Sequence, residues 1–173
     1  MLRLEVPVFP VKKDAILSLL EENGIRVNEY AKAACFGHPN FSCSSVSGPV
    51  PVVIASLSEL GCKDGATLPV ILQRIPSSGF RLCRPELGLF LRLFWKDQPE
   101  SRDAVLTGRH RAPDRAVTVL SEPFEADDVF PKGLYLRNVG GALWLRGYVC
   151  DALHVWSPDD LFALECRTPL FGS

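Results

Sequence analysis

The chain has 173 residues and a mass of 19.1 kDa, the size of one ordinary domain, which excludes a large modular protein. Apolar residues make up 47% and charged residues 23%, so the chain can bury a core and is not disordered by composition. Its 19 Lys and Arg against 20 Asp and Glu leave a net charge of −1, which argues against a general nucleic-acid binder. This charge disfavours a nucleic-acid partner, although aromatic and Arg side chains could still stack with single-stranded RNA, and we expect any anion recognition to be local.

The cysteine pattern and the start of the chain bear on compartment. The first residues lack the apolar segment of a secretory signal, and no run reaches the roughly 18 apolar residues of a membrane span. No C-x-x-C pair occurs among the cysteines, which argues against a structural zinc site and a disulfide scaffold. We expect a cytoplasmic protein with reduced thiols, no metal, no cofactor and no membrane partner.

The first half of the chain alternates helix and loop signals. Apolar periodicity predicts a helix over residues 12–23, and Asn28 can cap a second, short helix that ends at Cys35 or Phe36. Residues 37–50 are rich in Ser, Gly and Pro and are predicted to form a long loop. A buried strand is predicted over 52–57, and Thr67 is a good cap for a helix from Leu68 to about Ile75.

The second half is predicted to consist mainly of strands. Leu89 to Trp95 is apolar at nearly every position, which favours a central strand covered on both sides, after a turn at 85–88. Further strands are predicted at 104–106, 116–120 and 161–167, and two glycines at 140–141 predict a tight hairpin between two runs rich in β-forming residues.

These elements favour an α+β fold. About three helices would pack on one face of a curved, mostly antiparallel sheet of about five to seven strands. We expect one domain over residues 1–173, with a helical part at about 1–50 and a sheet part at about 51–173.

The predicted hairpin places a chemically distinctive set of side chains on one face. With the two glycines as the loop, Arg137 faces Trp144 and Tyr135 faces Arg146, while the leucines lie on the opposite face. Guanidinium groups bind carboxylate or phosphate, and aromatic rings offer an apolar floor, so this face is a candidate ligand site. The alternative is a face that is simply exposed, or covered by another element that packs on the rings and arginine stems. The candidate ligand-binding residues are Tyr135, Arg137, Trp144 and Arg146, with Trp95 and Trp156 as further walls.

Acid–base candidates are less specific, because no fixed spacing connects them. A carboxylate in an aromatic pocket would have a raised pKa and could act as a general acid or base. Glu86, Asp97 and His154 are the candidates, although a solvated or capping role is the simpler interpretation of each.

Short motifs also suggest a relationship. The stretches at 59–67, 82–88, 91–93 and 97–99, with Trp144-Leu145 and the segment at 154–160, resemble a set of uncharacterised bacterial proteins of similar length. Some members of that set are labelled helicase, but this chain has no G-x-x-x-x-G-K-[ST] phosphate loop and is too short for a two-lobed motor. Proteins of this kind are similar to those carried on mobile gene cassettes, and the resemblance implies an accessory role without naming a reaction.

Three hypotheses of function follow. The leading one is a protein that binds a small anionic or aromatic ligand on the hairpin face. The first alternative is a hydrolase or isomerase that uses Glu86, Asp97 or His154 as general base. The second is a module that assembles with itself or with another protein through the aromatic face, because Trp, Tyr and Arg are common interface anchors.

Overall fold

The structure, a computed structural model, describes residues 1–43, 45, 47–103 and 112–167. The helices are α1 (Lys13–Glu22), α2 (Glu29–Ala31), α3 (Leu68–Arg74) and α4 (Leu87–Phe94), with a π-helix at Lys32–Gly37 and a 3₁₀ helix at Ile75–Ser77. The strands are β1 (Leu2–Val8), β2 (Arg26–Val27), β3 (Gly48–Ser56), β4 (Ala66–Thr67), β5 (Phe80–Arg81), β6 (Val117–Val119), β7 (Gly133–Val139), β8 (Ala142–Tyr148), β9 (Val155–Trp156) and β10 (Leu161–Cys166).

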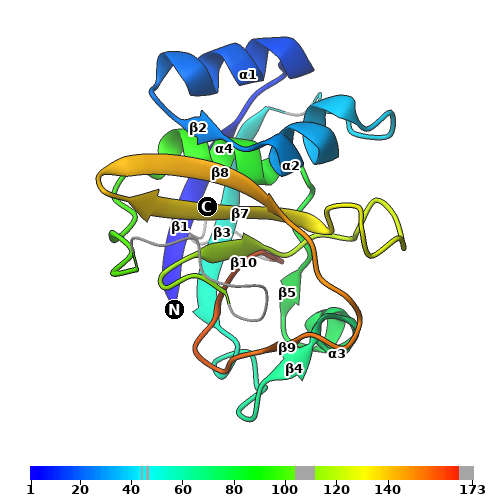
Figure 1. Cartoon of the computed structure of the whole chain (residues 1–173). Helices are drawn as coiled ribbons and strands as arrows, with labels where there is room; N and C mark the ends of the chain where they lie inside the picture. The colour runs from blue at the N-terminus through cyan, green and yellow to red at the C-terminus, as the bar shows by residue number, and fades with distance from the viewer. Residues whose placement is uncertain (44, 46, 104–111, 168–173) are drawn as a thin grey trace.

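One curled sheet organises the molecule (Figure 1). Its strands follow the order β1-β3-β10-β6-β7-β8-β2, and β5 pairs with β10 beside this path. The pairs β10–β6 and β2–β8 are parallel, and the remaining pairs of this sheet are antiparallel. The expected α+β class with a curved sheet is confirmed. The sheet is mixed, however, because β10 pairs in parallel with β6 and β2 pairs in parallel with β8. In each of these pairs the two strands are distant from one another in the sequence.

Each face of the sheet carries its own apolar core. Helices α1 and α4 cover one face, and their leucines and phenylalanines pack with β1 and with the leucines of the hairpin; we call this the first core. Helix α3 and the small β4–β9 sheet lie against the other face around Trp156, Phe162 and Leu164; we call this the second core. The prediction that the helices share one face is therefore wrong: both faces of the sheet are apolar over part of their area, and α3 covers the second one.

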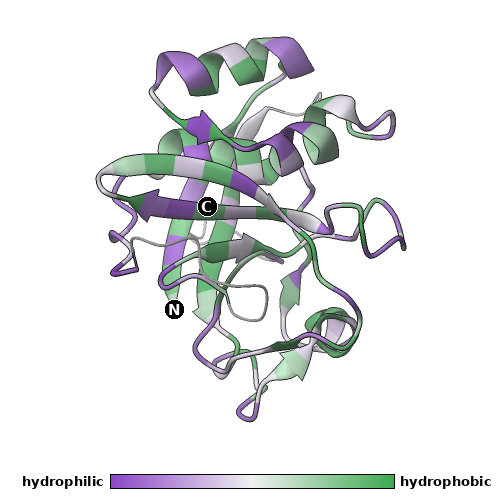
Figure 2. Ribbon diagram, viewed as in Figure 1, coloured by the Kyte–Doolittle hydropathy of each residue, from purple (hydrophilic) through white to green (hydrophobic). Residues whose placement is uncertain are grey.

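Residues 89–95 form most of helix α4 and the residue after it, so the prediction of a strand there is wrong. All residues of α4 except Phe94 are buried. A helix that is buried on nearly every side is apolar all round, and over eight residues such a pattern does not differ from that of a central strand. Figure 2 shows α4 in the hydrophobic colours behind the sheet.

Several other predictions are confirmed by the positions of the elements. Helices α1 and α3 and strands β3, β6 and β10 lie where the sequence patterns predicted them. Asn28 caps the short α2, as expected, and its side chain accepts a hydrogen bond from the Ala31 N–H. Strands β1 and β2 were not predicted, so the first fifty residues contribute sheet edges as well as helices. The strand predicted at 104–106 lies outside the described residues.

Candidate functional site

The hairpin β7–β8 has the register that the two glycines predicted. Gly140 and Gly141 have φ values of 57° and 73°, the left-handed conformation that a two-residue hairpin turn requires. Val139 pairs with Ala142, Arg137 with Trp144, Leu136 with Leu145 and Tyr135 with Arg146. Leu136 and Leu145 belong to the first core, so Tyr135, Arg137, Trp144 and Arg146 lie together on the opposite face.

Arg137 does not project freely from this face. Only 1% of the residue is exposed, and its guanidinium donates hydrogen bonds to Ser101 Oγ at 3.1 Å and to the Asp103 carbonyl. The segment 98–103 crosses the hairpin at this point, because the Ser101 N–H bonds to the Asn138 carbonyl at 2.8 Å. Arg137 therefore attaches this segment to the sheet.

The same segment is attached to the chain at 114–115. The Arg102 guanidinium and backbone N–H both donate to the Asp114 carboxylate, with Nη2 to Oδ1 at 2.8 Å and N to Oδ2 at 2.9 Å. These hydrogen bonds hold the pKa of Asp114 well below its usual range. Segment 98–103 thus covers the part of the hairpin face nearest Arg137. This part of the face corresponds to the alternative in which another element packs on the hairpin side chains.

The end of the hairpin face nearest β2 is more open, and it contains a second arginine that the sequence did not indicate. Arg26 pairs with Trp144 across the parallel β2–β8 ladder, so the two side chains share one face. The guanidinium carbon of Arg26 lies 5.4 Å from the Trp144 ring centroid, and that of Arg146 lies 5.0 Å from it. Arg146 Nε also donates to the Tyr135 hydroxyl at 2.8 Å, which fixes its position. We call Arg26, Tyr135, Trp144 and Arg146 the arginine–indole cluster.

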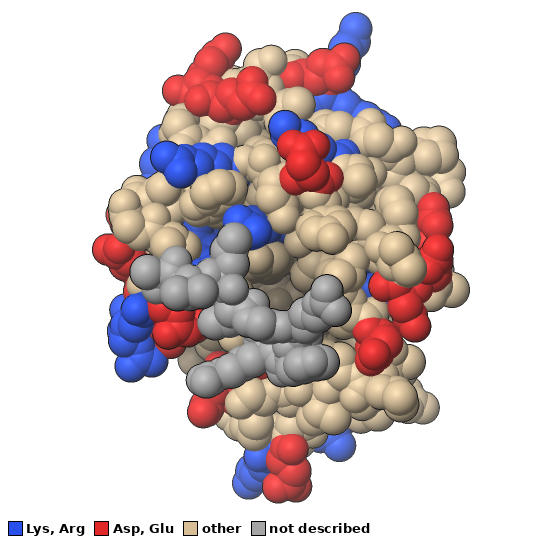
Figure 3. Space-filling view, in the orientation of Figure 1, with Lys and Arg blue, Asp and Glu red and all other residues tan. Residues whose placement is uncertain are grey.

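The charges of this cluster have no acidic partner among the described residues. In the described part of the chain, no carboxylate lies within salt-bridge distance of either Arg26 or Arg146. Among the described residues, the hydrogen bond of the Arg146 guanidinium uses Nε, and neither Nη1 nor Nη2 is bonded to a described group. The space-filling view of this face shows Lys and Arg atoms at the margin of a hollow below the hairpin (Figure 3). Within the described chain, an anion could therefore approach the cluster without the loss of an ion pair.

The two other tryptophans lie apart from the cluster. Trp95 follows α4 and packs against the first core, on the opposite face of the sheet from Trp144. Trp156 is buried in the second core, where its ring lies 5.6 Å from Tyr148 and 5.2 Å from Phe162 in edge-on contacts. Neither ring joins the arginine–indole cluster, so the ligand-binding roles expected for them stay predictions without support from this geometry.

The three acid–base candidates do not meet either. Glu86 precedes α4, is 6% exposed, and pairs with Arg84 at 3.4 Å. Asp97 is exposed beyond the other end of α4, so a helix of eight residues, about 12 Å long, lies between the two positions. His154 packs edge-on against Trp156 at 5.0 Å in the second core. Each of the three would have to act alone in general acid–base catalysis.

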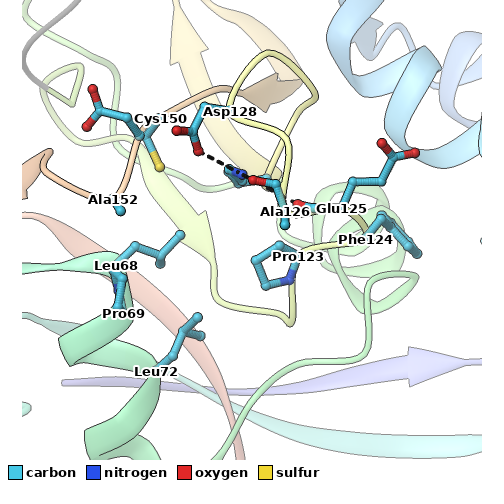
Figure 4. A pocket seen from close by; sticks show the side chains of 12 residues that line it. Leu68, Pro69, Leu72, Pro123, Phe124, Glu125, Ala126, Asp128, Cys150 and Ala152 are labelled. Atoms are coloured by element: carbon cyan, nitrogen blue, oxygen red, sulfur yellow. Dashed lines mark hydrogen bonds and ion pairs between the residues drawn. The ribbon is translucent and has the colours of Figure 1, made fainter.

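A cavity of about 370 Å³, which no sequence pattern predicted, lies beside the second core. Helix α3, the loop at 123–128 and residues 150–152 form its walls, with the Cys150 sulfur directed between them (Figure 4). Burial raises the pKa of Cys150 to about 11, so its thiol is protonated at neutral pH and is a poor nucleophile. The six cysteines all lie in the described ranges and none is paired.

His38 fixes the loop at 123–128 from the other side. Its Nδ1 accepts the Asn40 backbone N–H at 3.2 Å, so the ring proton lies on Nε2, which donates to Glu125 Oε1 at 3.1 Å. The ring also lies 4.7 Å from that of Phe124, and only 6% of the residue is exposed. This histidine positions a cavity wall and is not a free base.

A buried polar network around Arg92 is a further feature that the sequence patterns did not predict. Arg92 has no exposed surface; it donates to Gln98 Oε1 and to the Trp95 carbonyl, and no carboxylate of the described chain pairs with it. Burial lowers the pKa of Arg92 to about 10. The arginine within the apolar run at 89–95 was the one available signal, because a charged residue there needs an internal partner.

Comparison of the chain with protein-family models, curated proteins and solved structures gave no match. The resemblance to small bacterial proteins therefore stays a prediction. In the residues that the structure describes, no helix has the length and apolar composition to cross a bilayer. The same residues contain no group of three His, Cys, Asp or Glu side chains placed to hold a metal ion.

Proposed function

We propose that this protein is an accessory binding protein for a small anionic ligand with an aromatic or other flat apolar part. The ligand would bind at the arginine–indole cluster. The observation that carries the proposal is the pair of guanidinium groups at 5.0 and 5.4 Å from one indole ring, with no carboxylate in the described chain to neutralise them.

The chemistry of the cluster suits such a ligand. A guanidinium presents parallel N–H donors that match two oxygens of a carboxylate or phosphate. Arg146 is already oriented by the Tyr135 hydroxyl, so less side-chain entropy is lost when it binds. Trp144 is partly exposed and can stack with a ring of the ligand. Arg137, which was expected to bind the ligand as well, instead supports the segment that borders the cluster.

The two alternatives have less support. An enzyme would need a base beside the ligand, and Glu86, Asp97 and His154 all lie outside the cluster. An interaction module that uses the aromatic face would place Trp144 in an interface, and self-association of the protein would then depend on this residue.

The test is a thermal-shift titration with phenyl phosphate. Inorganic phosphate and phenol, which each represent one half of this compound, are titrated for comparison. A ligand at a hundredfold excess over its dissociation constant adds about 2.7 kcal/mol of stability, which raises the melting temperature by several degrees. We expect phenyl phosphate to give a larger shift than either half alone. Arg26→Ala and Arg146→Ala should each lose most of the shift, and Trp144→Leu should lose the part that the ring adds.

Arg81→Ala is the matched control, because Arg81 is an exposed strand arginine on β5. It should respond to phenyl phosphate as the unmodified protein does. Equal shifts in Arg26→Ala, Arg146→Ala and Arg81→Ala would show a general salt effect and overturn the proposal. If no ligand shifts the melting temperature and Trp144→Leu changes the sedimentation coefficient instead, the interface alternative is correct.

A further inference from the structure

The cavity beside α3 is chemically distinct from the arginine–indole cluster. Its walls are mainly apolar, with Leu68, Pro69 and Leu72 on α3 facing Pro123 and Phe124 on the loop across from it. Figure 4 shows these side chains on two sides of one space, with Ala152 and Cys150 closing a third side. A volume of about 370 Å³ lies in the range of small-molecule sites, and walls of this kind favour a hydrocarbon or aromatic ligand.

Lys132 is the one cation among the described residues that line the cavity, and its ammonium is already bonded on every side. Lys132 is buried, and its ammonium donates to the carbonyls of Ala126 at 2.8 Å, Asp127 at 2.9 Å and Glu125 at 3.4 Å. It also pairs with Asp128 Oδ1 at 3.1 Å. Its role is to fold the loop at 125–128 around itself, so the cavity offers no free positive charge to a ligand.

Negative charge, in contrast, is in excess at the cavity margin. Glu125, Asp128 and Asp151 line it, but Glu125 accepts from His38 Nε2 and Asp128 pairs with Lys132. Among the described lining residues, Asp151 is therefore the carboxylate that no cation or histidine engages. Asp151 Oδ1 accepts the backbone N–H groups of Leu153 and His154 at 2.9 and 2.8 Å, which fixes the carboxylate in place. Within the described chain, its second oxygen has no hydrogen-bond partner. An apolar ligand with a positive group would match both the apolar walls and this carboxylate.

We propose that this cavity is a binding site for a small hydrophobic cation, an aromatic or alkyl amine, whose apolar part lies against α3 and Phe124 and whose ammonium group faces Asp151. The site is separate from the arginine–indole cluster and has the opposite charge preference. The proposal therefore does not depend on the function proposed above, and each can fail without the other.

The test is an NMR titration of the whole protein with three compounds that share one ring and differ in charge: phenethylamine, phenethyl alcohol and phenylacetate. We expect phenethylamine to shift the backbone amide signals of Leu72, Ala126 and Ala152, which line the cavity. Phenylacetate should bind about tenfold more weakly, because attraction to the carboxylates becomes repulsion. Phenethyl alcohol should lie between the two.

Two variants with matched controls locate the site. Ala152 is an exposed residue whose side chain lines the cavity, so Ala152→Trp should fill the space and abolish the shifts without loss of folding. Its neighbour Leu153 is 83% exposed and does not line the cavity, so Leu153→Trp should bind as before. Asp151→Asn keeps the oxygen that accepts the two backbone N–H groups, and it should weaken phenethylamine about threefold. Asp159→Asn, at an exposed position away from the cavity, should not.

Three outcomes would overturn the proposal. One is the absence of any shift at these amides with millimolar phenethylamine. Another is equal or tighter binding of phenylacetate, which would show that the margin does not select a cation. The third is unchanged phenethylamine binding in Ala152→Trp, which would place the amine elsewhere on the protein.

Discussion

At the residue scale, the buried Arg92 shows how this protein accommodates a charge without a carboxylate. Gln98 is 2% exposed and accepts from the Arg92 guanidinium through Oε1, while its Nε2 donates to the carbonyls of Arg115 at 2.9 Å and Leu136 at 3.1 Å. One amide side chain thus satisfies a buried cation and two backbone groups. Arg92 Nε has no hydrogen-bond partner in the described chain, so the guanidinium depends on Gln98 Oε1 and the Trp95 carbonyl.

Removal of the Gln98 amide should therefore destabilise the folded protein. We expect Gln98→Leu to lower the free energy of unfolding by about 2–4 kcal/mol, because the guanidinium and the Leu136 carbonyl stay buried without their partner. Chemical denaturation followed by circular dichroism measures this change. Gln73→Leu is the control, since Gln73 is exposed on α3, and it should change stability by less than about 0.5 kcal/mol. Similar losses in both variants would contradict the role given to Gln98.

At the element scale, α2 is attached to β8 by a contact that only glycine allows. A Cβ added at Gly147 would lie 2.6 Å from the Tyr30 carbonyl carbon and 2.7 Å from the Ala31 nitrogen. Asn28 Oδ1 accepts from both the Ala31 and the Gly147 N–H groups, at 2.9 and 2.8 Å. The cap of the helix is therefore also its connection to the sheet, and β8 holds β2 and α2 in place together.

Gly147→Ala should separate these elements. The added methyl group would clash with backbone atoms of Tyr30 and Ala31, which cannot avoid it by a change of rotamer. We therefore expect the free energy of unfolding to fall by about 3 kcal/mol and α2 to be displaced from β8. Hydrogen exchange of the Ala31 and Gly147 amides, with the denaturation midpoint, measures both effects. In Gly37→Ala the added Cβ would meet only the Lys32 carbonyl at 3.8 Å, and the loss should stay under about 1 kcal/mol. Protected Ala31 and Gly147 amides in Gly147→Ala would contradict the prediction.

The elements also show why some of the fold was predictable. The hairpin register depended on two adjacent glycines and alternating side chains, all within sixteen residues, so local rules were sufficient. Helix α4 was missed because burial on all sides removes the periodicity that separates helix from strand. Part of the candidate site was also predictable from local rules, because Trp144 and Arg146 lie on one strand of the hairpin. Arg26 was not, because a two-residue strand in a parallel pair leaves no local pattern.

At the scale of the whole molecule, two cores share the strands between them. On β3, Val52 belongs to the first core and its neighbour Val53 to the second; on β10, Ala163 and Leu164 divide in the same way. A disturbance of either core must pass through these strands, since successive side chains of a strand point to opposite faces. We therefore expect the described cores to unfold as one cooperative unit.

Matched cavities in the two cores test this. Leu89 in the first core and Leu164 in the second have no exposed surface, so Leu89→Ala and Leu164→Ala should each cost about 2–5 kcal/mol. In a background where Trp95 and Trp144 are replaced by Phe, the fluorescence of Trp156 reports on the second core alone. Its transition should coincide with that of circular dichroism in both variants. A Trp156 transition that does not move in Leu89→Ala, while the circular dichroism transition does, would mean that the two faces of the sheet unfold independently. In that case the shared strands β3 and β10 would not couple the cavity side of the molecule to the side that α4 covers.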